Sequence, residues 1–176
     1  MSPGIGDPAP GFRLPTTDGD EIALDGLGDS PVVVVAFWCN HCPYVRAWED
    51  RFNAIARDYA ERGVATVAIC ANDASSHPGD SFENMALRAA ERGYVFAYAR
   101  DDSQSVARAY GAERTPEIVV LDRSRAVAYR GAIDDSTDPE TVTTHHLRDA
   151  LDAVLTGRAP SVPSTPALGC TIKWSR

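Results

Sequence analysis

The most constraining feature of the sequence is a pair of cysteines that directly follows an apolar, β-branched run. The run Val32 to Phe37 has the composition and length of a strand that is buried on both faces. The cysteines come next, in the segment Trp38-Cys39-Asn40-His41-Cys42-Pro43. Apolar residues then recur every three or four positions from Val45 to Tyr59, which predicts a helix that ends at Gly63. The two cysteines therefore stand at a strand-to-helix junction.

This position predicts reactive thiols. A thiol in the first turn of a helix meets unpaired backbone N–H groups and the positive end of the helix dipole, and both favour the nucleophilic thiolate. The two-residue gap lets the sulfurs close a small disulfide ring. We expect Cys39, nearer the helix end, to attack a substrate disulfide, and Cys42, one turn inside, to resolve the mixed disulfide. Protonated His41 would stabilise the Cys39 thiolate further.

The rest of the chain continues to alternate between strands and helices. This order predicts an α/β sheet with helices on both faces and an antiparallel pair at its end. The predicted elements are a strand at 64–70, a helix capped by Asp80 or Ser81 and closed by Gly93, a strand at 94–98, a short helix through Val106 and Tyr110, a hairpin of 117–121 and 126–129, and a helix from Pro139 to Gly157.

Length and charge limit the classes of protein to consider. The 176 residues fit one domain, 1–176, with a substantial core. The formal net charge of −8 argues against nucleic acid and anionic membrane surfaces as partners. The first residues have neither the basic nor the apolar region of a secretory signal, and no apolar run could span a bilayer. These features predict a cytoplasmic protein, in which cysteines rarely serve as a structural disulfide framework.

The Trp-Cys-x-x-Cys segment after a buried strand resembles thioredoxin, and Thr115-Pro116 resembles the cis-proline loop of that fold. The resemblance implies a thioredoxin-like fold in which this loop lies against the dithiol. It also implies that Thr115 and Pro116 bind the substrate chain. Trp38 and His41 are then the candidates for tuning the thiolate.

Further segments resemble the redoxin branch of that superfamily, the AhpC/TSA or peroxiredoxin-like proteins. The resemblance implies an amino-terminal extension, an inserted helix–strand unit and no metal or organic cofactor. Protein or low-molecular-weight disulfides are the implied substrates, and a thioredoxin reductase or a small thiol is the implied reductant. The segments are Gly6-Asp7-Pro8-Ala9-Pro10 with Phe12-Arg13-Leu14, Ala71-Asn72-Asp73, Pro78-Gly79-Asp80-Ser81, residues 130–135, and Gly169-Cys170-Thr171-Ile172-Lys173-Trp174.

Two departures from these families bear on the chemistry. Thioredoxin has a buried acid six residues before its first cysteine, whereas Val33 stands at that position here. Peroxiredoxins place their reactive cysteine in Pro-x-x-x-Thr-x-x-Cys, and neither Cys39 nor Cys42 has that context. Dithiol–disulfide exchange is therefore the leading prediction. The alternative is a thiol peroxidase, in which Cys39 or Cys42 attacks a peroxide and either Cys170 or the other motif cysteine resolves the sulfenate.

A second alternative is a non-catalytic module whose dithiol binds a metal or a partner. A single Cys-x-x-Cys pair is weak support for zinc, and covalent haem attachment would require histidine where Pro43 stands.

Several other residues have both an inert and a functional interpretation. Cys70 ends a predicted strand and is expected to be inert core. Cys170 lies in a Pro- and Ser-rich tail, 158–176, which we expect to dock, so that Cys170 is either inert or an additional redox cysteine. Asn72 and Asp73 form a turn or line the site, Glu117 is a proton acceptor or a paired carboxylate, and His146 is a half-buried helix residue rather than a metal ligand.

Overall fold

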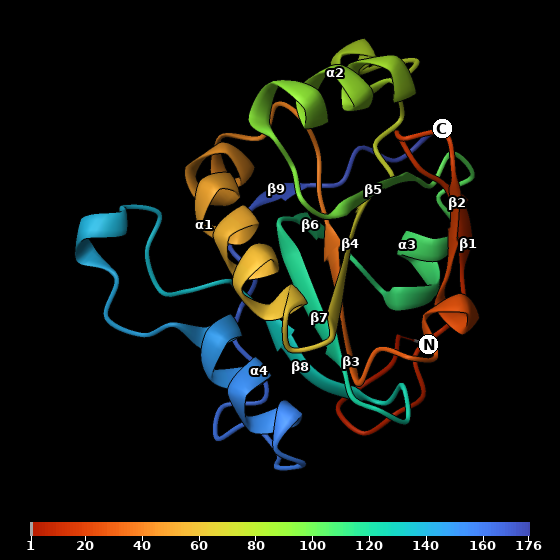
Figure 1. Cartoon of the computed structure of the whole chain (residues 1–176). Helices are drawn as coiled ribbons and strands as arrows, with labels where there is room; N and C mark the ends of the chain where they lie inside the picture. The colour runs from red at the N-terminus through yellow and green to blue at the C-terminus, as the bar shows by residue number, and fades with distance from the viewer. Residues whose placement is uncertain (1) are drawn as a thin grey trace.

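The computed structural model describes residues 2–176, and its centre is a mixed five-stranded sheet with the order β5-β4-β3-β7-β8 (Figure 1). The strands β3 (Val32–Phe37), β4 (Val64–Cys70) and β5 (Ala97–Arg100) are parallel. β7 (Glu117–Leu121) is antiparallel to β3, and β8 (Val127–Gly131) is antiparallel to β7. The α/β prediction with a final antiparallel pair is therefore confirmed.

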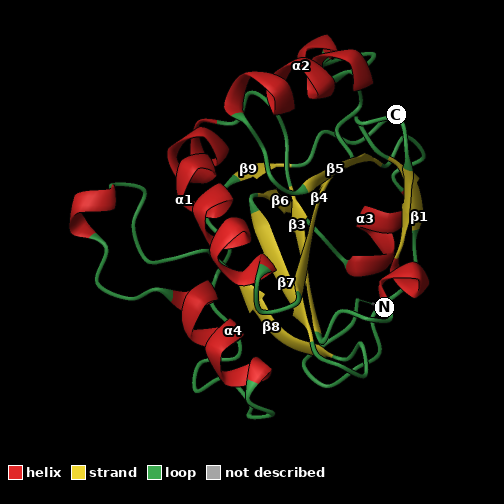
Figure 2. Cartoon of the chain, viewed as in Figure 1, coloured by secondary structure: helices red, strands yellow, loops and turns green. Residues whose placement is uncertain are grey.

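The helices cover both faces of the sheet, as expected (Figure 2). α1 (Pro43–Ala60), α2 (Phe82–Arg92) and α4 (His146–Leu155) pack on one face, where Val32, Val34 and Ala36 of β3 point. α3 (Ser105–Tyr110) packs on the other face, against Val33, Val35 and Phe37. Every residue of β3 is buried, because the side chains of a central strand alternate between two covered faces.

The amino-terminal extension forms a small hairpin beside the sheet. β1 (Arg13–Pro15) pairs with β2 (Glu21–Ala23), a 3-10 turn η1 (Leu24–Leu27) follows, and Thr16 bridges to Ala99 of β5. The pair α2 and β5 is inserted between β4 and α3, after the short turn η2 (Pro78–Asp80), and β5 extends the edge of the sheet. The extension and the inserted helix–strand unit are thus present.

Two predicted boundaries are wrong. The strand expected at 94–98 is β5 at 97–100, because Tyr94 and Phe96 belong to an aromatic cluster with Trp38 rather than to the ladder. The helix expected from Pro139 begins only at His146. Pro139 instead starts the 3-10 turn η3 (Pro139–Thr141), and the β-branched residues that follow it favour extended backbone over helix.

Two short strands complete the fold. β6 (Arg114–Thr115) pairs antiparallel with β9 (Cys170–Thr171), with Thr115 opposite Cys170. β9 crosses the end of the sheet at which β3 runs into α1 (Figure 1). The chain that leads to it is bonded to β8, where the Thr165 N–H donates to the Arg130 carbonyl at 3.0 Å.

Candidate active site

The two cysteines of the motif lie in the loop between β3 and α1. The helix starts at Pro43, whose missing N–H is not needed in a first turn and whose φ is already helical. Cys42 is therefore the N-cap, and its carbonyl oxygen accepts the first helical hydrogen bond from Arg46 at 3.0 Å. The expectation that Cys42 lies one turn inside the helix is wrong, since Cys42 is the cysteine at the helix end and Cys39 precedes it in the loop.

Three of the four thiols gather at this point. Cys42 Sγ lies 2.8 Å from Cys170 Sγ, and the thiols of Cys39 and Cys42 are hydrogen-bond partners. All four cysteines are free. Cys39 is 3% and Cys42 is 5% exposed, whereas Cys170 is half-buried. The motif thiols are thus covered, and part of the cover is the tail that carries Cys170.

Hydrogen bonds and burial shift the pKa values of the three thiols in different directions. The pKa of Cys42 is lowered, first by a hydrogen bond from Cys39 and then by hydrogen bonds from the Cys170 thiol and from the backbone at Val45 in the first turn of α1. The pKa of Cys39 is raised, because its thiol is the donor to Cys42 and because it is buried. Partial burial and the hydrogen bond to Cys42 raise the pKa of Cys170 to about 11. These shifts favour the thiolate on Cys42 over the thiolate on Cys39.

Thr115 and Pro116 lie directly against the thiols. β3 and β7 pair with Phe37 opposite Glu117, so the residues that precede β7 meet the residues that follow β3. Thr115 Oγ1 is 3.3 Å from Cys39 Sγ, and the Thr115 carbonyl oxygen is 3.2 Å from Cys42 Sγ. The Thr115–Pro116 peptide bond is cis, as the resemblance implies. That these residues bind a substrate chain stays a prediction.

A buried polar network holds the loop between the cysteines. The backbone N–H of Asn40 donates to Asp80 Oδ1 at 2.7 Å, and its side chain donates to the Gly79 carbonyl at 2.9 Å. Tyr98 donates to Asn40 Oδ1 at 2.8 Å. Asp80 is 4% exposed, and its second oxygen accepts from Asn72 Nδ2 at 2.9 Å. The shape of the loop thus depends on a carboxylate forty positions along the chain.

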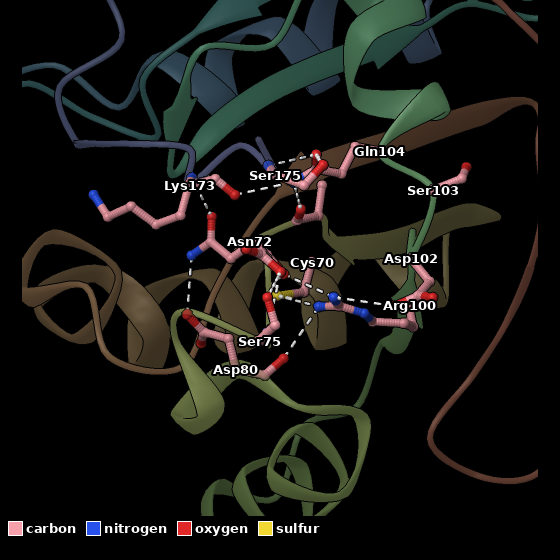
Figure 3. A network of polar contacts seen from close by, with 12 residues as sticks. Cys70, Asn72, Ser75, Asp80, Arg100, Asp102, Ser103, Gln104, Lys173 and Ser175 are labelled. Carbon is pink, nitrogen blue, oxygen red and sulfur yellow. Dashed lines mark hydrogen bonds and ion pairs between the residues drawn. The ribbon is translucent and has the colours of Figure 1, made fainter.

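The same network reaches the carboxy-terminal tail (Figure 3). Asn72 Oδ1 accepts from the backbone N–H of Lys173 at 2.9 Å, while Gln104 Nε2 donates to the Lys173 carbonyl at 2.9 Å. The buried guanidinium of Arg100 donates to the Asn72 carbonyl at 2.7 Å and to the Asp80 carbonyl at 3.1 Å. Asn72 therefore connects the tail with the carboxylate that fixes the cysteine loop.

Asn40, Asp80 and Gln104 belong to this network, although the sequence analysis did not give any of them a role at the site. Asp80 was expected as a possible cap of α2, but Ser81 is the N-cap, and its hydroxyl accepts from the Asn84 N–H. Asn72 is a structural bridge rather than only a turn residue, whereas Asp73 does form a turn with Ser75 and Ser76. The available signal was that polar Asn72 lies two residues after the buried strand β4, at the sheet edge where α/β proteins place their sites.

The proposed tuning residues have different surroundings. Trp38 is fully buried and donates from Nε1 to the Tyr94 hydroxyl at 3.2 Å. His41 is exposed, its Nδ1 lies 3.1 Å from Arg46 Nη2, and its ring packs on Gly79. Within residues 2–176 no hydrogen bond joins His41 to a thiol. A tuning effect of His41 stays a prediction that would act through its charge.

The remaining candidates fit the inert interpretations. Cys70 is fully buried, and burial raises the pKa of its thiol to about 11. Glu117 pairs with Arg130 at 3.6 Å, and burial raises its pKa. His146 is half-buried in α4. In the part of the chain that the structure describes, no group of three or more His, Cys, Asp or Glu side chains could hold a metal ion, and no helix is long and apolar enough to cross a membrane.

A sheet whose central strand runs into a Cys-x-x-Cys helix start, with a Thr-Pro strand against the sulfurs, defines a thioredoxin-like protein. A putative thiol:disulfide interchange protein DsbE from Chlorobium tepidum has this fold, with a TM-score of 0.65, 24% identity and coverage of 89% of this chain and 98% of its own. The chain belongs to the AhpC/TSA family, whose family model matches residues 5–130.

Two solved structures are similar over nearly the whole chain. A hypothetical protein from Sinorhizobium meliloti 1021 shares 40% identity, with a TM-score of 0.93 and coverage of 99% of this chain and 97% of its own. An uncharacterized conserved protein from Geobacillus kaustophilus shares 41% identity, with a TM-score of 0.92 and coverage of 98% and 93%. No curated protein matches the sequence.

Proposed function

We propose that the protein is a thiol–disulfide oxidoreductase whose redox couple is Cys39 and Cys42. The observation that carries the proposal is the pair of motif thiols at the start of α1, in which Cys42 is the helix N-cap and both sulfurs contact Thr115. Membership of the AhpC/TSA family and the thioredoxin-like fold support a thiol-based redox reaction.

The proposed reaction moves two electrons from the dithiol to a disulfide. The Cys42 thiolate attacks one sulfur of the substrate, a Cys42–substrate disulfide forms, and the other substrate sulfur leaves as a thiolate that takes a proton. Cys39 then attacks Cys42 Sγ, loses its proton to the second leaving thiolate, and closes the Cys39–Cys42 disulfide. The order differs from the expectation that Cys39 attacks first, because the hydrogen bonds favour the thiolate on Cys42.

In a reducing cytosol this couple would run toward substrate reduction. A thioredoxin reductase or a small thiol would restore the dithiol by the reverse exchange. The placement in the cytoplasm and the reductant are part of the proposal, and the charge of −8 offers no attraction for nucleic acid.

Trapping of the mixed disulfide tests the proposal. The reduced protein is incubated with a peptide disulfide, and turnover is measured for the wild type, Cys42→Ser, the double variant Cys39→Ser/Cys170→Ser and, as a control, Cys70→Ser. We expect turnover to be lost in Cys42→Ser and in the double variant and retained in the control, with the mixed disulfide accumulating on Cys42 of the double variant, which has no neighbouring thiol left to resolve it. Turnover that survives Cys42→Ser would overturn the proposal.

A peroxidase is the second candidate, favoured by the AhpC/TSA match. In that reaction a thiolate attacks a peroxide oxygen to give a sulfenic acid and an alcohol or water, and a neighbouring thiol then forms a disulfide and releases water. Consumption of hydrogen peroxide by the same reduced protein separates the two functions. Peroxide turnover that is faster than disulfide turnover and needs Cys170 would assign the peroxidase.

A further inference from the structure

The carboxy-terminal strand occupies the place beside the thiols that an extended substrate chain would need. β9 pairs antiparallel with β6, and the register sets Cys170 opposite Thr115, the residue that contacts both Cys39 and Cys42. Addition of an extended segment to an exposed strand is a common way to bind a polypeptide. Here the chain itself supplies that segment.

The sulfur of the added strand points at the Cys42 sulfur. Cys170 Sγ lies 2.8 Å from Cys42 Sγ, which is longer than the roughly 2.05 Å of a bonded disulfide but close enough for a disulfide to form. Cys170 is also the most exposed of the three thiols. A cysteine in an extended strand, placed against an attacking sulfur, has the arrangement of a substrate cysteine.

The fit of the strand depends on a residue without a side chain. A Cβ at Gly169 would lie 2.2 Å from the Thr115 carbonyl oxygen and 2.6 Å from its carbonyl carbon. Both are backbone atoms that cannot turn away, so only glycine allows this approach. The Gly169 carbonyl also accepts from Arg114 at 3.0 Å.

The body of the protein holds the tail beyond Cys170 as well. Ile172 is buried, and its N–H donates to the Glu113 carbonyl at 2.9 Å. Lys173 is bonded through its backbone to Asn72, Asp73 and Gln104. The segment 169–173 is thus seated along its whole length.

We propose that the segment 169–173 is an internal substrate, which covers the dithiol and forms a disulfide between Cys170 and Cys42. The proposal rests on the dithiol exchange proposed above, and it defines the external substrate class. A polypeptide disulfide must enter as an extended strand on β6 in place of the tail, with a small residue before its cysteine.

The steps balance with a disulfide as the oxidant. Cys42 attacks the external disulfide and releases one thiol; Cys170 then attacks Cys42 Sγ, gives its proton to the second leaving thiolate, and forms Cys42–Cys170. Attack of Cys39 on Cys42 Sγ moves the bond to Cys39–Cys42 and returns Cys170 as a thiol, with no change in oxidation state. The tail cysteine can therefore receive the bond before the motif closes.

Disulfide mapping in the full chain tests the first part. Reduced Cys39→Ser is treated with one equivalent of 2-hydroxyethyl disulfide, quenched and analysed by peptide mass spectrometry. We expect the Cys42–Cys170 linked peptide, and its formation should slow by about tenfold or more when Gly169→Ala is added, since the seated population falls. Gly11→Ala is the matched control, because a Cβ there meets nothing within 4 Å. A persistent Cys42 mixed disulfide with free Cys170 would overturn the proposal.

Turnover of a peptide disulfide with a Gly-Cys segment tests the second part. With all cysteines present, Gly169→Ala should raise kcat/KM by about tenfold, because the covered population is lost, and Gly11→Ala should leave it unchanged. A fall in kcat/KM in a Gly169→Ala protein with wild-type circular dichroism would overturn the internal-substrate role. If Gly169→Ala does not fold, the Cys42–Cys170 linked peptide in Cys39→Ser is the measurement that tests the tail proposal.

The two proposals fail in different ways. Absence of the linked peptide while the wild type turns over would overturn the tail proposal alone, whereas absence of wild-type turnover would overturn both.

Discussion

Replacement of Asp80 by asparagine should destabilise the protein far more than a nearby replacement of the same chemistry. The Asp80 carboxylate is buried and accepts from the Asn40 N–H at 2.7 Å and from Asn72 Nδ2 at 2.9 Å. An asparagine side chain has one acceptor oxygen, so one of these two donors loses its partner. A hydrogen bond to a charged group contributes about 1.5–3 kcal/mol, and a buried unpaired donor costs about 1–3 kcal/mol. We therefore expect Asp80→Asn to lower the free energy of unfolding by about 3–5 kcal/mol.

The matched control is Asp102→Asn. The Asp102 side chain is 91% exposed and lies 3.4 Å from Arg100, the residue that also bonds the Asp80 backbone. An exposed ion pair contributes at most about 1 kcal/mol, so this variant should be nearly as stable as the wild type. The assay is urea unfolding of both variants with the thiols kept reduced, which removes any contribution from disulfides.

A second measurement follows from the charge of Asp80. After the hydrogen bond to Cys42 and burial, that charge is a further cause that raises the pKa of Cys39. Asp80→Asn should therefore lower the apparent pKa of the Cys39–Cys42 dithiol, as followed by ultraviolet thiolate absorbance, and Asp102→Asn should not. Equal stability of the two variants, or an unchanged thiol titration in Asp80→Asn, would refute the role of the network in shaping the cysteine loop.

Three further predictions concern stability. The Glu49 side chain is 2% exposed and pairs with Arg88 and Arg92, so Glu49→Gln should lower the free energy of unfolding in urea by about 3–5 kcal/mol. The control is Glu91→Gln, whose side chain is 70% exposed and which should lower it by less than about 1 kcal/mol. Gly93 ends α2 with φ of 62°, so Gly93→Ala should cost about 1–2 kcal/mol, a loss that thermal unfolding would detect and that wild-type stability would contradict. Hydrogen bonds lower the pKa of Asp135 from its ordinary value of 3.8 to about 2. The ionised carboxylate therefore stabilises the folded state above about pH 4, and this stabilisation is lost as the pH falls toward 2. Asp135→Asn should be less stable than the wild type at pH 7 and equal to it near pH 2 in paired unfolding curves.

The parts of the fold that local pattern determines could be predicted from the sequence. Local sequence determines the buried strand β3, the apolar face of α1 and the end of α2 at Gly93, and each lies where it was predicted. The short pair β6 and β9 carries no such pattern. Two residues on each side are too few for a period, and their partners are 55 positions apart, between Thr115 and Cys170.

The site shows the same division. Cys39 and Cys42 are recognisable from spacing, but the depth of Cys42 at the helix start depends on where the helix begins, and Pro43 sets that boundary. The role of Asp80 depends on long-range packing, because its partner Asn40 is distant in the chain. The proximity of Cys170 was left open for the same reason. Only the folded tail brings its sulfur to the motif.

The tryptophans give the protein built-in optical probes. Its three indoles sit in three separate places: Trp38 directly before Cys39, Trp48 within α1 and bonded to Asp134, and Trp174 in the tail, stacked 4.4 Å from the Arg108 guanidinium. Trp38 and Trp48 are buried, whereas Trp174 is partly exposed and would enter water on release of the tail. A fluorescence record with one indole retained at a time can thus resolve thiol exchange, unfolding and tail movement as three signals without an added dye.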